Sequence, residues 1–486
     1  MLENIRSKYI LQKIFDYLKN KKKLKLIKCN KKILDDLNIS KDDFQKYKTL
    51  KEFNKKYSTF IDDIDTKKLH LQNIKLDNEG LECLIKLKFK NLEILKLIND
   101  NIPVNNISEN IYFNNLKELY LRNMNLTNIE FLEKIKFQSL EVLDLTDNRI
   151  VDIKFLKDEK FKGLKKLHLE NNNVGLNVKE LENVKFDKLE ILNLSGNRIP
   201  NIKFENLDCE ELKELELSWS GLSGINILNK VKFKKLEKMF FDANQIENIT
   251  VLEPLNLTEL KHINFRNNKI IDINALDKFN FEKLESLSLF DNKISDIKVF
   301  ENLILNYLKT LNLEYNNISD IYPLQKFRAE NLQDLNLSRN QISDIKVLEN
   351  VKFEKLESLY LNVNKISDIN VLENVNFKKL KLLDLGKNLI SDIKVLERVN
   401  FKKLERLLLF SNLISDINVL EKTNFKKLYL LNLGYNKISD LSVFKKIKFE
   451  NLKTLVISNN LTKEEENSEI ISYLKVEPQE KKCIII

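Results

Sequence analysis

The sequence predicts an α/β solenoid with a parallel sheet on its concave wall, short helical or irregular segments on its convex wall, and a small helical region before the first turn. The main observation is a unit of 24 residues, clearest at 356–379, that repeats through most of the 486-residue chain. Its first leucine recurs 16 times, from Leu92 to Leu452. A fixed period of this kind is typical of stacked repeats rather than of packed globular domains.

Each unit opens with a short alternation of leucines that predicts a strand, with Leu359 and Leu361 on its buried face. Asn364 follows three residues later, and a buried amide there can bond backbone groups where the chain leaves the strand. Stacked copies would form an asparagine ladder. We expect it to be weaker towards the N-terminal half, where three units carry another residue: Asp100, Met124 and Ser220.

The second half of the unit begins with "ISDI", where Ser367 and Asp368 can cap a short helical segment of the convex wall. This aspartate occurs once per turn without a second carboxylate beside it, which favours a structural role over a metal site. The closing stretch "VLENVNFKKL" directs Val371, Leu372 and Phe377 inward and its lysines outward.

The pattern L-x-x-L-x-L-x-x-N-x-I resembles the leucine-rich repeat family over roughly residues 69–460. Its "NxISDI" form is similar to the subclass found in the protein-phosphatase-1 regulatory subunit and in bacterial internalins. The resemblance implies a horseshoe of about 16–17 repeats over 61–460, used as a scaffold for protein binding.

Aromatic side chains on the expected concave wall are the candidate anchors of a protein partner. Five lie between the leucines of predicted strands: Tyr120, Phe240, Phe290, Tyr360 and Phe410. Three more lie at strand edges: Trp219, Tyr315 and Tyr435. Charges of both signs alternate with these rings, whereas nucleic acid would call for a basic stripe. The wall therefore predicts a protein partner.

Catalysis finds little support in the sequence. The chain has only 8 glycines and no phosphate-binding glycine motif. His168 and His262 belong to units four turns apart, about 19 Å at the usual strand spacing, so they are not expected to share a metal. We expect neither an enzyme nor a bound cofactor.

Residues 1–60 lie outside the repeat and hold 17 Lys or Arg against 7 Asp or Glu, while the charges of the remaining chain balance. Their apolar spacing predicts short helices that serve as a basic cap for the first turn. The same spacing resembles an F-box, which implies docking onto a cullin-type ubiquitin ligase, although Ser7 and Lys8 replace the expected Leu-Pro pair. The matching apolar positions are Ile10, Leu11, Ile14, Phe15 and Leu18.

The C-terminal end predicts a capping helix over 461–478 and a flexible tail over 479–486. The tail fits the prenylation form C-a-a-X at Cys483, which would tether the protein to a membrane. Charged residues interrupt the first twenty positions and the four cysteines are scattered, so we expect a cytoplasmic protein at the cytosolic face of a membrane. Three functions stay open: a tethered scaffold or adaptor, an F-box-like ligase subunit, and a phosphatase-regulator-like subunit.

Overall fold

The computed structural model divides into two compact units, Met1–Glu216 and Leu217–Ile486. The residues that the structure describes are 41–61, 65–99, 112–199, 207, 209–225, 228, 231, 233–252, 255, 257–447, 450–461 and 484–485. The F-box-like positions from Ile10 to Leu18, the capping helix beyond residue 461 and Cys483 lie outside these ranges. Among the described residues, no helix combines the length and the apolar character that a membrane crossing requires.

The first unit is a parallel sheet in which each strand pairs with the strand of the following repeat. Leu69 faces Leu95 and Leu95 faces Leu119, so the leucines of successive repeats lie in register. The strands are β1 (Lys68–Gln72), β2 (Ile94–Ile98), β4 (Glu118–Arg122), β6 (Val142–Asp144), β7 (Lys166–His168), β8 (Ile191–Asn193) and β9 (Glu214–Glu216). A separate two-stranded sheet joins β3 (Tyr112–Phe113) to β5 (Lys136–Phe137).

Helical segments cover the other side of this unit. They are α4 (Lys41–Lys56), α5 (Asn78–Leu87), α6 (Phe131–Lys134), η3 (Lys154–Lys157), η4 (Glu159–Phe161) and η5 (Gly175–Asn183). α4 packs beside α5 and buries Tyr47, Leu50 and Phe53. The Asn54 amide then fixes the chain that leaves α4 through two hydrogen bonds with the backbone of Ile61, of 2.8 and 3.0 Å.

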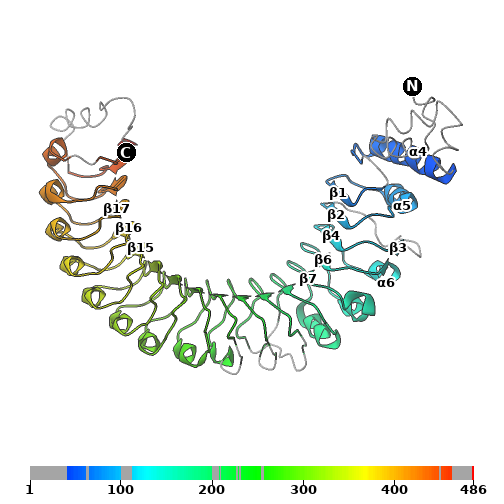
Figure 1. The fold of residues 1–486 in the computed structure, drawn as a ribbon, viewed down its shortest axis with the longest axis horizontal. Helices are drawn as coiled ribbons and strands as arrows, with labels where there is room; N and C mark the ends of the chain where they lie inside the picture. The colour runs from blue at the N-terminus through cyan, green and yellow to red at the C-terminus, as the bar shows by residue number, and fades with distance from the viewer. Residues whose placement is uncertain are drawn as a thin grey trace, which may run out of the picture. The chain divides into compact units, whose positions relative to one another are not determined.

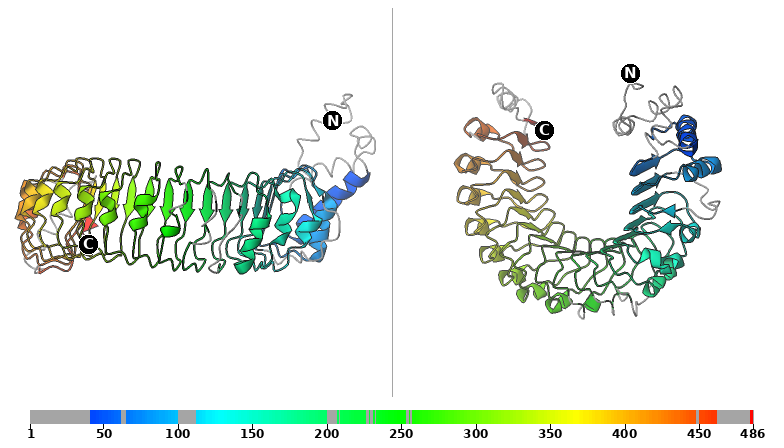
Figure 2. Two further views of the ribbon diagram at one scale, coloured as in Figure 1. Left: turned by 90° about the horizontal axis from the view of Figure 1, so that it is seen from below. Right: turned by 45° about the vertical axis from the view of Figure 1, so that its right-hand side comes forward.

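The second unit repeats the same plan with pairs 24 residues apart: Leu335 faces Leu359, and Leu359 faces Leu383. Its strands are β10 (Lys238–Phe240), β11 (His262–Asn264), β12 (Ser286–Ser288), β13 (Thr310–Asn312), β14 (Asp334–Asn336), β15 (Ser358–Tyr360), β16 (Leu382–Asp384), β17 (Arg406–Leu408), β18 (Leu430–Asn432), β19 (Thr454–Val456) and β20 (Ile484–Ile485). Within this unit the strands line the inner side and the helical segments the outer side (Figures 1 and 2). The predicted solenoid with a parallel sheet is confirmed.

The helical segments of the second unit are all short 3-10 helices in its described part. They are η7 (Thr250–Leu252), η8 (Asn274–Lys278), η9 (Lys298–Glu301), η10 (Tyr322–Gln325), η11 (Lys346–Glu349), η12 (Asn370–Glu373), η13 (Lys394–Glu397), η14 (Asn418–Lys422) and η15 (Ser442–Lys445). At η12 the Oδ1 atom of Asp368 accepts the backbone N–H of Asn370 at 2.9 Å. The same contact recurs at Asp296, Asp320, Asp344, Asp392, Asp416 and Asp440. The recurring aspartate thus accepts the first N–H of the helical segment, as the predicted capping role requires, but from the position before the N-cap; the N-cap itself, Ile369 at η12, makes no side-chain cap hydrogen bond.

The asparagine ladder is also confirmed. The side-chain amide of Asn388 donates to the carbonyl of Leu361 in the preceding repeat at 3.0 Å and to that of Leu385 at 3.1 Å. Its oxygen accepts the N–H of Ile366 at 3.0 Å. Each ladder asparagine therefore bonds the backbones of two adjacent repeats, and this links the turn of one repeat to the strand of the next.

The C-terminal residues differ from the expected flexible tail at two positions. Ile484 and Ile485 form β20, which pairs in parallel with Thr454 and Leu455 of β19. The physical reason is that the last strand of a solenoid has an open edge whose N–H and C=O groups can accept a further strand.

Candidate protein-binding surface

In the described repeats the chain leaves the strand through a residue with positive φ, directly before the ladder position. The first unit mostly uses residues that tolerate this conformation: Asn73, Asn99, Asn123, Asp147, Asn171 and Gly196. The second unit places a wider range of residues there, and we call these the left-handed row: Trp219, Ala243, Asn267, Asp291, Tyr315, Arg339, Val363, Lys387, Ser411, Tyr435 and Asn459. Several of its members are bulky or β-branched.

Three aromatic members of the left-handed row combine backbone strain with exposure. Trp219, Tyr315 and Tyr435 have φ values of 55°, 56° and 57°. Their side chains are 70%, 51% and 61% exposed, so burial of the rings does not offset the strain. A bulky residue with positive φ costs roughly 1–3 kcal/mol, and such strain concentrates at binding and active sites. Their positions at the edge of the inner wall therefore point to a contact surface.

Tyr315 belongs to a set of side chains that we call the Arg–aromatic stack, which is Arg266, Phe290, Tyr315 and Arg339 from four successive repeats. The rings of Phe290 and Tyr315 are stacked, with centroids 6.4 Å apart and planes at 27°. The Arg266 guanidinium carbon lies 4.8 Å from the Phe290 ring centre, and that of Arg339 lies 5.9 Å from the Tyr315 ring centre. Rings between two guanidinium groups offer both apolar area and hydrogen-bond donors.

Two buried acceptor atoms lie near this stack on the same wall. Asp242 Oδ1 and Asn267 Oδ1 are buried and accept no hydrogen bond from the described part of the chain. The backbone of Asn267 connects this region to the stack, because its N–H donates to the carbonyl of Phe290 at 2.8 Å. The carbonyl of Asp242 accepts the N–H of Trp219 at 2.9 Å. Buried acceptors without a donor are costly, which suits a surface that meets a partner's N–H or O–H groups.

Tyr120 of the first unit is held by its own neighbours. The Lys96 ammonium lies 4.2 Å from its ring centre, and its hydroxyl donates to Glu118 at 2.9 Å. Burial, together with the hydrogen bond to Glu118, raises the pKa of Tyr120 to about 12, so the hydroxyl keeps its proton at neutral pH. Arg122 is likewise engaged, because its Nε donates at 2.8 Å to the buried Asp144. The polar groups around this ring are satisfied within the unit.

Next along this wall lie His168 and Glu170. Burial lowers the pKa of His168, and burial with the nearby Asp147 and Asp144 raises the pKa of Glu170. A lowered pKa keeps the imidazole neutral at pH 7, where it can donate and accept hydrogen bonds without carrying a positive charge.

Phe410 and a buried carboxylate, Asp384, both lie close to Gly386 in the C-terminal half of the second unit. The Phe410 ring lies against Gly386, where a Cβ would collide with it. Asp384 is only 8% exposed and accepts the N–H of Gly386 at 2.9 Å. Burial raises the pKa of Asp384 to about 6. Tyr360 lies on the neighbouring strand β15, where it is the β-sheet pairing partner of Asp384 in β16.

Of the eight predicted anchors, the structure brings together Phe290 and Tyr315. The other rings belong to separate repeats, and Phe240, like Tyr360, is half-buried within its strand. Sequence reasoning places Arg266 and Arg339 among the mixed charges of the inner wall, but it missed their contacts with the stacked rings and the positive φ of the edge residues. The positive φ could have been predicted by aligning the repeats, because Trp219, Tyr315 and Tyr435 occupy the position that asparagine holds in other repeats.

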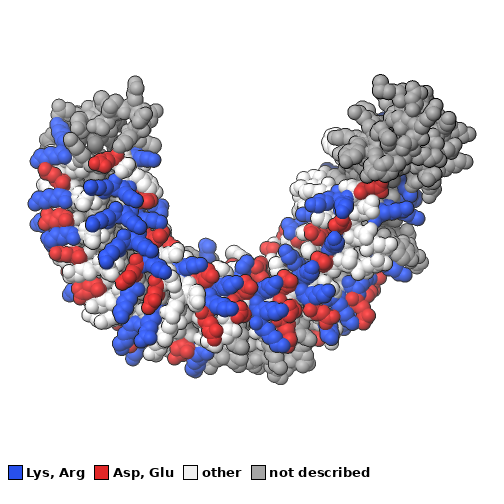
Figure 3. Space-filling model, in the orientation of Figure 1, with Lys and Arg blue, Asp and Glu red and all other residues white. Residues whose placement is uncertain are grey.

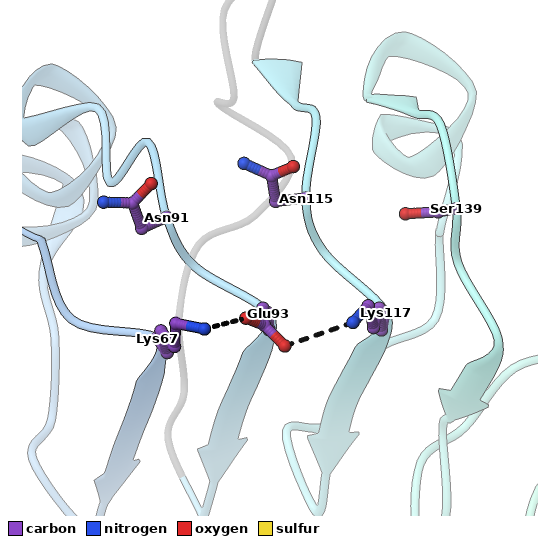
Figure 4. A pocket seen from close by; sticks show the side chains of 6 residues that line it. All are labelled: Lys67, Asn91, Glu93, Asn115, Lys117 and Ser139. Atoms are coloured by element: carbon purple, nitrogen blue, oxygen red, sulfur yellow. Dashed lines mark hydrogen bonds and ion pairs between the residues drawn. The ribbon is translucent and has the colours of Figure 1, made fainter.

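A rim of alternating lysines and glutamates was also missed. Lys67 and Lys117 flank Glu93 at 2.8 and 3.2 Å, beside a shallow hollow of about 240 Å³ (Figure 4). The first unit repeats such pairs at Lys165–Glu141 and Lys213–Glu190, and the second unit has its own at Lys261–Glu237, Lys309–Glu285 and Lys381–Glu357. The sequence signal of the rim is the charge of alternating sign directly after the first leucine of most repeats. Because these charges are paired and exposed, each pair adds little stability, and the rim is a poor candidate for ligand binding.

Comparison with known proteins agrees with the repeat assignment. Residues 114–158 and 330–374 match the family described as Leucine Rich repeats (2 copies), and residues 305–321 match Leucine Rich repeat. No curated protein sequence matches the chain.

Among solved structures, a Leptospira interrogans LRR protein is 21% identical with a TM-score of 0.51, over 87% of this chain and 96% of that one. An internalin from Listeria monocytogenes is 27% identical with a TM-score of 0.45, over 71% and 82% of the two chains. A plant peptide hormone receptor in complex with its ligand is 21% identical with a TM-score of 0.47, over 73% and 65%. The matched segments carry leucine-rich repeats, and the 24-residue period and the in-register parallel sheet extend the same repeat architecture along the described part of the chain.

Proposed function

We propose that the chain is a protein-binding scaffold whose partner contacts the inner wall of the second unit, centred on the Arg–aromatic stack. The observation that carries this proposal is the left-handed row. There the second unit places exposed aromatic residues at positions where the first unit keeps asparagine, aspartate or glycine. Strain without burial is retained most readily where the side chain has another use.

The chemistry of the stack favours a folded protein or peptide as the partner. Tyr, Trp and Arg are the residues enriched at the energetic centres of protein interfaces. The guanidinium of Arg339 lies 3.5 Å from Glu314, and Asn336 donates to the same carboxylate at 2.8 Å. Donors and acceptors therefore alternate beside the rings, which suits a mixed peptide surface better than a uniformly charged polymer.

The test is capture of partners by the full chain and by two matched variants. Tyr315→Asn with Phe290→Ser removes both rings of the stack. Tyr307→Asn with Tyr322→Asn removes two tyrosines that are similarly exposed, at 59% and 56%, but lie outside the inner wall. We expect the first variant to lose the partners that the wild type enriches, and the second to keep them. Equal enrichment by all three proteins would contradict the proposal.

Membrane tethering through a prenylated Cys483 is a further part of this proposal, supported by the C-a-a-X form of the last four residues. Modification would require β20 to release Ile484 and Ile485 from β19. Cys483→Ser should then shift the protein from the membrane fraction to the cytosolic fraction. An unchanged distribution of the variant would rule the tether out.

The alternative roles concern the N-terminal segment and the repeat subclass. An F-box-like ligase subunit would depend on Phe15 and Leu18, and a phosphatase-regulator-like subunit on the repeats alone. Capture of cullin-ligase components by the wild type, abolished by Phe15→Glu with Leu18→Glu, would support the ligase role. Absence of those components from the wild-type capture would dismiss it.

A further inference from the structure

One flank of the second unit carries an unusual concentration of lysines. Three successive repeats place a pair of lysines directly before their first leucine, and we call this set the lysine flank: Lys378, Lys379, Lys402, Lys403, Lys426 and Lys427. All six side chains are exposed. The pairs precede the strands β16, β17 and β18, and neighbouring strands lie about 4.8 Å apart, so the three pairs lie side by side. Figure 3 shows Lys and Arg gathered over the region of β15–β17.

The positive charge of the lysine flank is not balanced by nearby acids. Among the described residues, none of these six ammonium groups forms an ion pair or a hydrogen bond. Elsewhere in the unit, a lysine at the same position of the repeat has an acidic partner: Lys283, directly before Leu284, lies 2.7 Å from Glu259. One further lysine pair of the unit, Lys234 with Lys235, has interaction partners. Other repeats carry mixed residues at these two positions, for example Glu330 with Asn331 and Glu354 with Lys355. The uncompensated charge is confined to three adjacent repeats.

We propose that the lysine flank binds the surface of an anionic lipid bilayer. The set consists of lysines alone, which act as hydrated point charges suited to diffuse attraction by a charged plane. A cluster of about four to eight basic residues is the usual requirement for attraction to anionic lipids. Nucleic acid is a weaker fit, since its binding surfaces combine a basic groove with rings on which bases stack.

The inference goes beyond the proposed protein scaffold and does not need the partner on the inner wall. The lysine flank would act as a second membrane-binding signal beside the proposed prenyl group on Cys483, because a single prenyl chain binds membranes only marginally. The lysine pairs precede the strands and do not lie on them, so contact through the flank need not cover the side chains of the inner wall.

Cosedimentation with vesicles tests the inference, using the full chain produced in bacteria so that no prenyl group is present. The vesicles are phosphatidylcholine alone or phosphatidylcholine mixed with phosphatidylserine. The flank variant changes six residues: Lys378→Gln, Lys379→Gln, Lys402→Gln, Lys403→Gln, Lys426→Gln and Lys427→Gln. The control changes six exposed, unpaired lysines elsewhere in the described part of the unit: Lys293→Gln, Lys298→Gln, Lys346→Gln, Lys365→Gln, Lys394→Gln and Lys437→Gln.

We expect the wild type and the control to bind the phosphatidylserine vesicles within about twofold of each other, and the flank variant to bind at least about tenfold less. Binding should fall as salt is raised, because the attraction is electrostatic. Circular dichroism checks that the variants are folded.

Three results would overturn the inference. They are no binding of the wild type, equal binding of the flank variant, and a loss of the same size in the control. Equal binding would assign the attraction to another basic segment such as residues 1–60. If the wild type binds no vesicles but retains single-stranded RNA, the lysine flank would be assigned to nucleic acid instead. Partner capture through Tyr315 is a separate measurement, so either proposal can fail alone.

Discussion

The aromatic residues of the left-handed row lower the stability of the fold through their backbone conformation, while their side chains stay exposed. Tyr435 shows this at its simplest, because it has a φ of 57° and a side chain that is 61% exposed. Asn459 holds the same position in the next repeat with a φ of 56°, a conformation that asparagine adopts more easily.

Tyr435→Asn should therefore raise the free energy of unfolding by about 1 kcal/mol. The reverse change, Asn459→Tyr, should lower it by a similar amount. Urea denaturation followed by circular dichroism measures both effects. A loss of stability in Tyr435→Asn would mean that the ring packs favourably and that strain does not argue for its function.

A second effect at the residue scale concerns Asp384, whose buried carboxyl has a pKa raised to about 6. In the unfolded chain an aspartate titrates near 4, so folding favours the protonated form. The stability that this preference supplies is complete below about pH 4 and is lost as the pH rises through about 6.

At pH 8 the ionised Asp384 therefore weakens the fold, by up to about 3 kcal/mol. Asp384→Asn keeps an oxygen that can accept the Gly386 N–H and removes the charge. We expect the variant to gain stability over the wild type at pH 8 and to gain much less at pH 5, as urea midpoints would show. An equal difference between the two proteins at both pH values would contradict the burial argument.

At the scale of elements, the asparagine ladder joins each strand to its neighbour. Asn388 bonds Leu361, Leu385 and Ile366, so its loss leaves backbone groups of two repeats without partners. Asn388→Ala should lower the free energy of unfolding by roughly 2–4 kcal/mol, as urea denaturation would measure.

Asn370→Ala is the matched control for the ladder, because Asn370 begins η12 with an exposed side chain. Asn370→Ala should lower the free energy of unfolding by no more than about 0.5 kcal/mol. Similar costs for both substitutions would show that position in the ladder does not matter.

The elements also show what the sequence could predict. The strand leucines and Asn388 recur at one period, so their burial and bonding followed from the repeat alone. The φ of Tyr315 could be found only by aligning it with the asparagines at the same position in other repeats, because a tyrosine by itself carries no local signal for a left-handed backbone. The contacts of Arg266 and Arg339 with the stacked rings depend on side-chain rotamers across four repeats, which periodicity leaves open. The lysine pairs were visible as "NFKK", but their lack of acidic partners depends on residues in adjacent turns.

For the whole molecule, a repeat that contacts only its neighbours should be removable as a unit. Deletion of 308–331 would join residue 307 to Leu332 and bring two repeats together in the register that all others share. We expect the shortened protein to keep its β signal in circular dichroism and a cooperative unfolding transition. It should also lose the partners that depend on Tyr315. A control deletion that is six residues shorter than one repeat would break the register. We expect it to unfold the array locally, which would show that the register matters and not the loss of residues as such.

Because the register is constant, equivalent side chains on the inner wall of the second unit are separated by a fixed distance per repeat. Tyr315 and Tyr435 lie five repeats apart, which corresponds to about 24 Å at the usual strand spacing. An extended peptide covers about 3.3 Å per residue, so a ligand that touches both rings needs roughly seven residues between its contact points. Because each repeat adds the same step, inserting or removing one would change the length of ligand that fits without altering either ring.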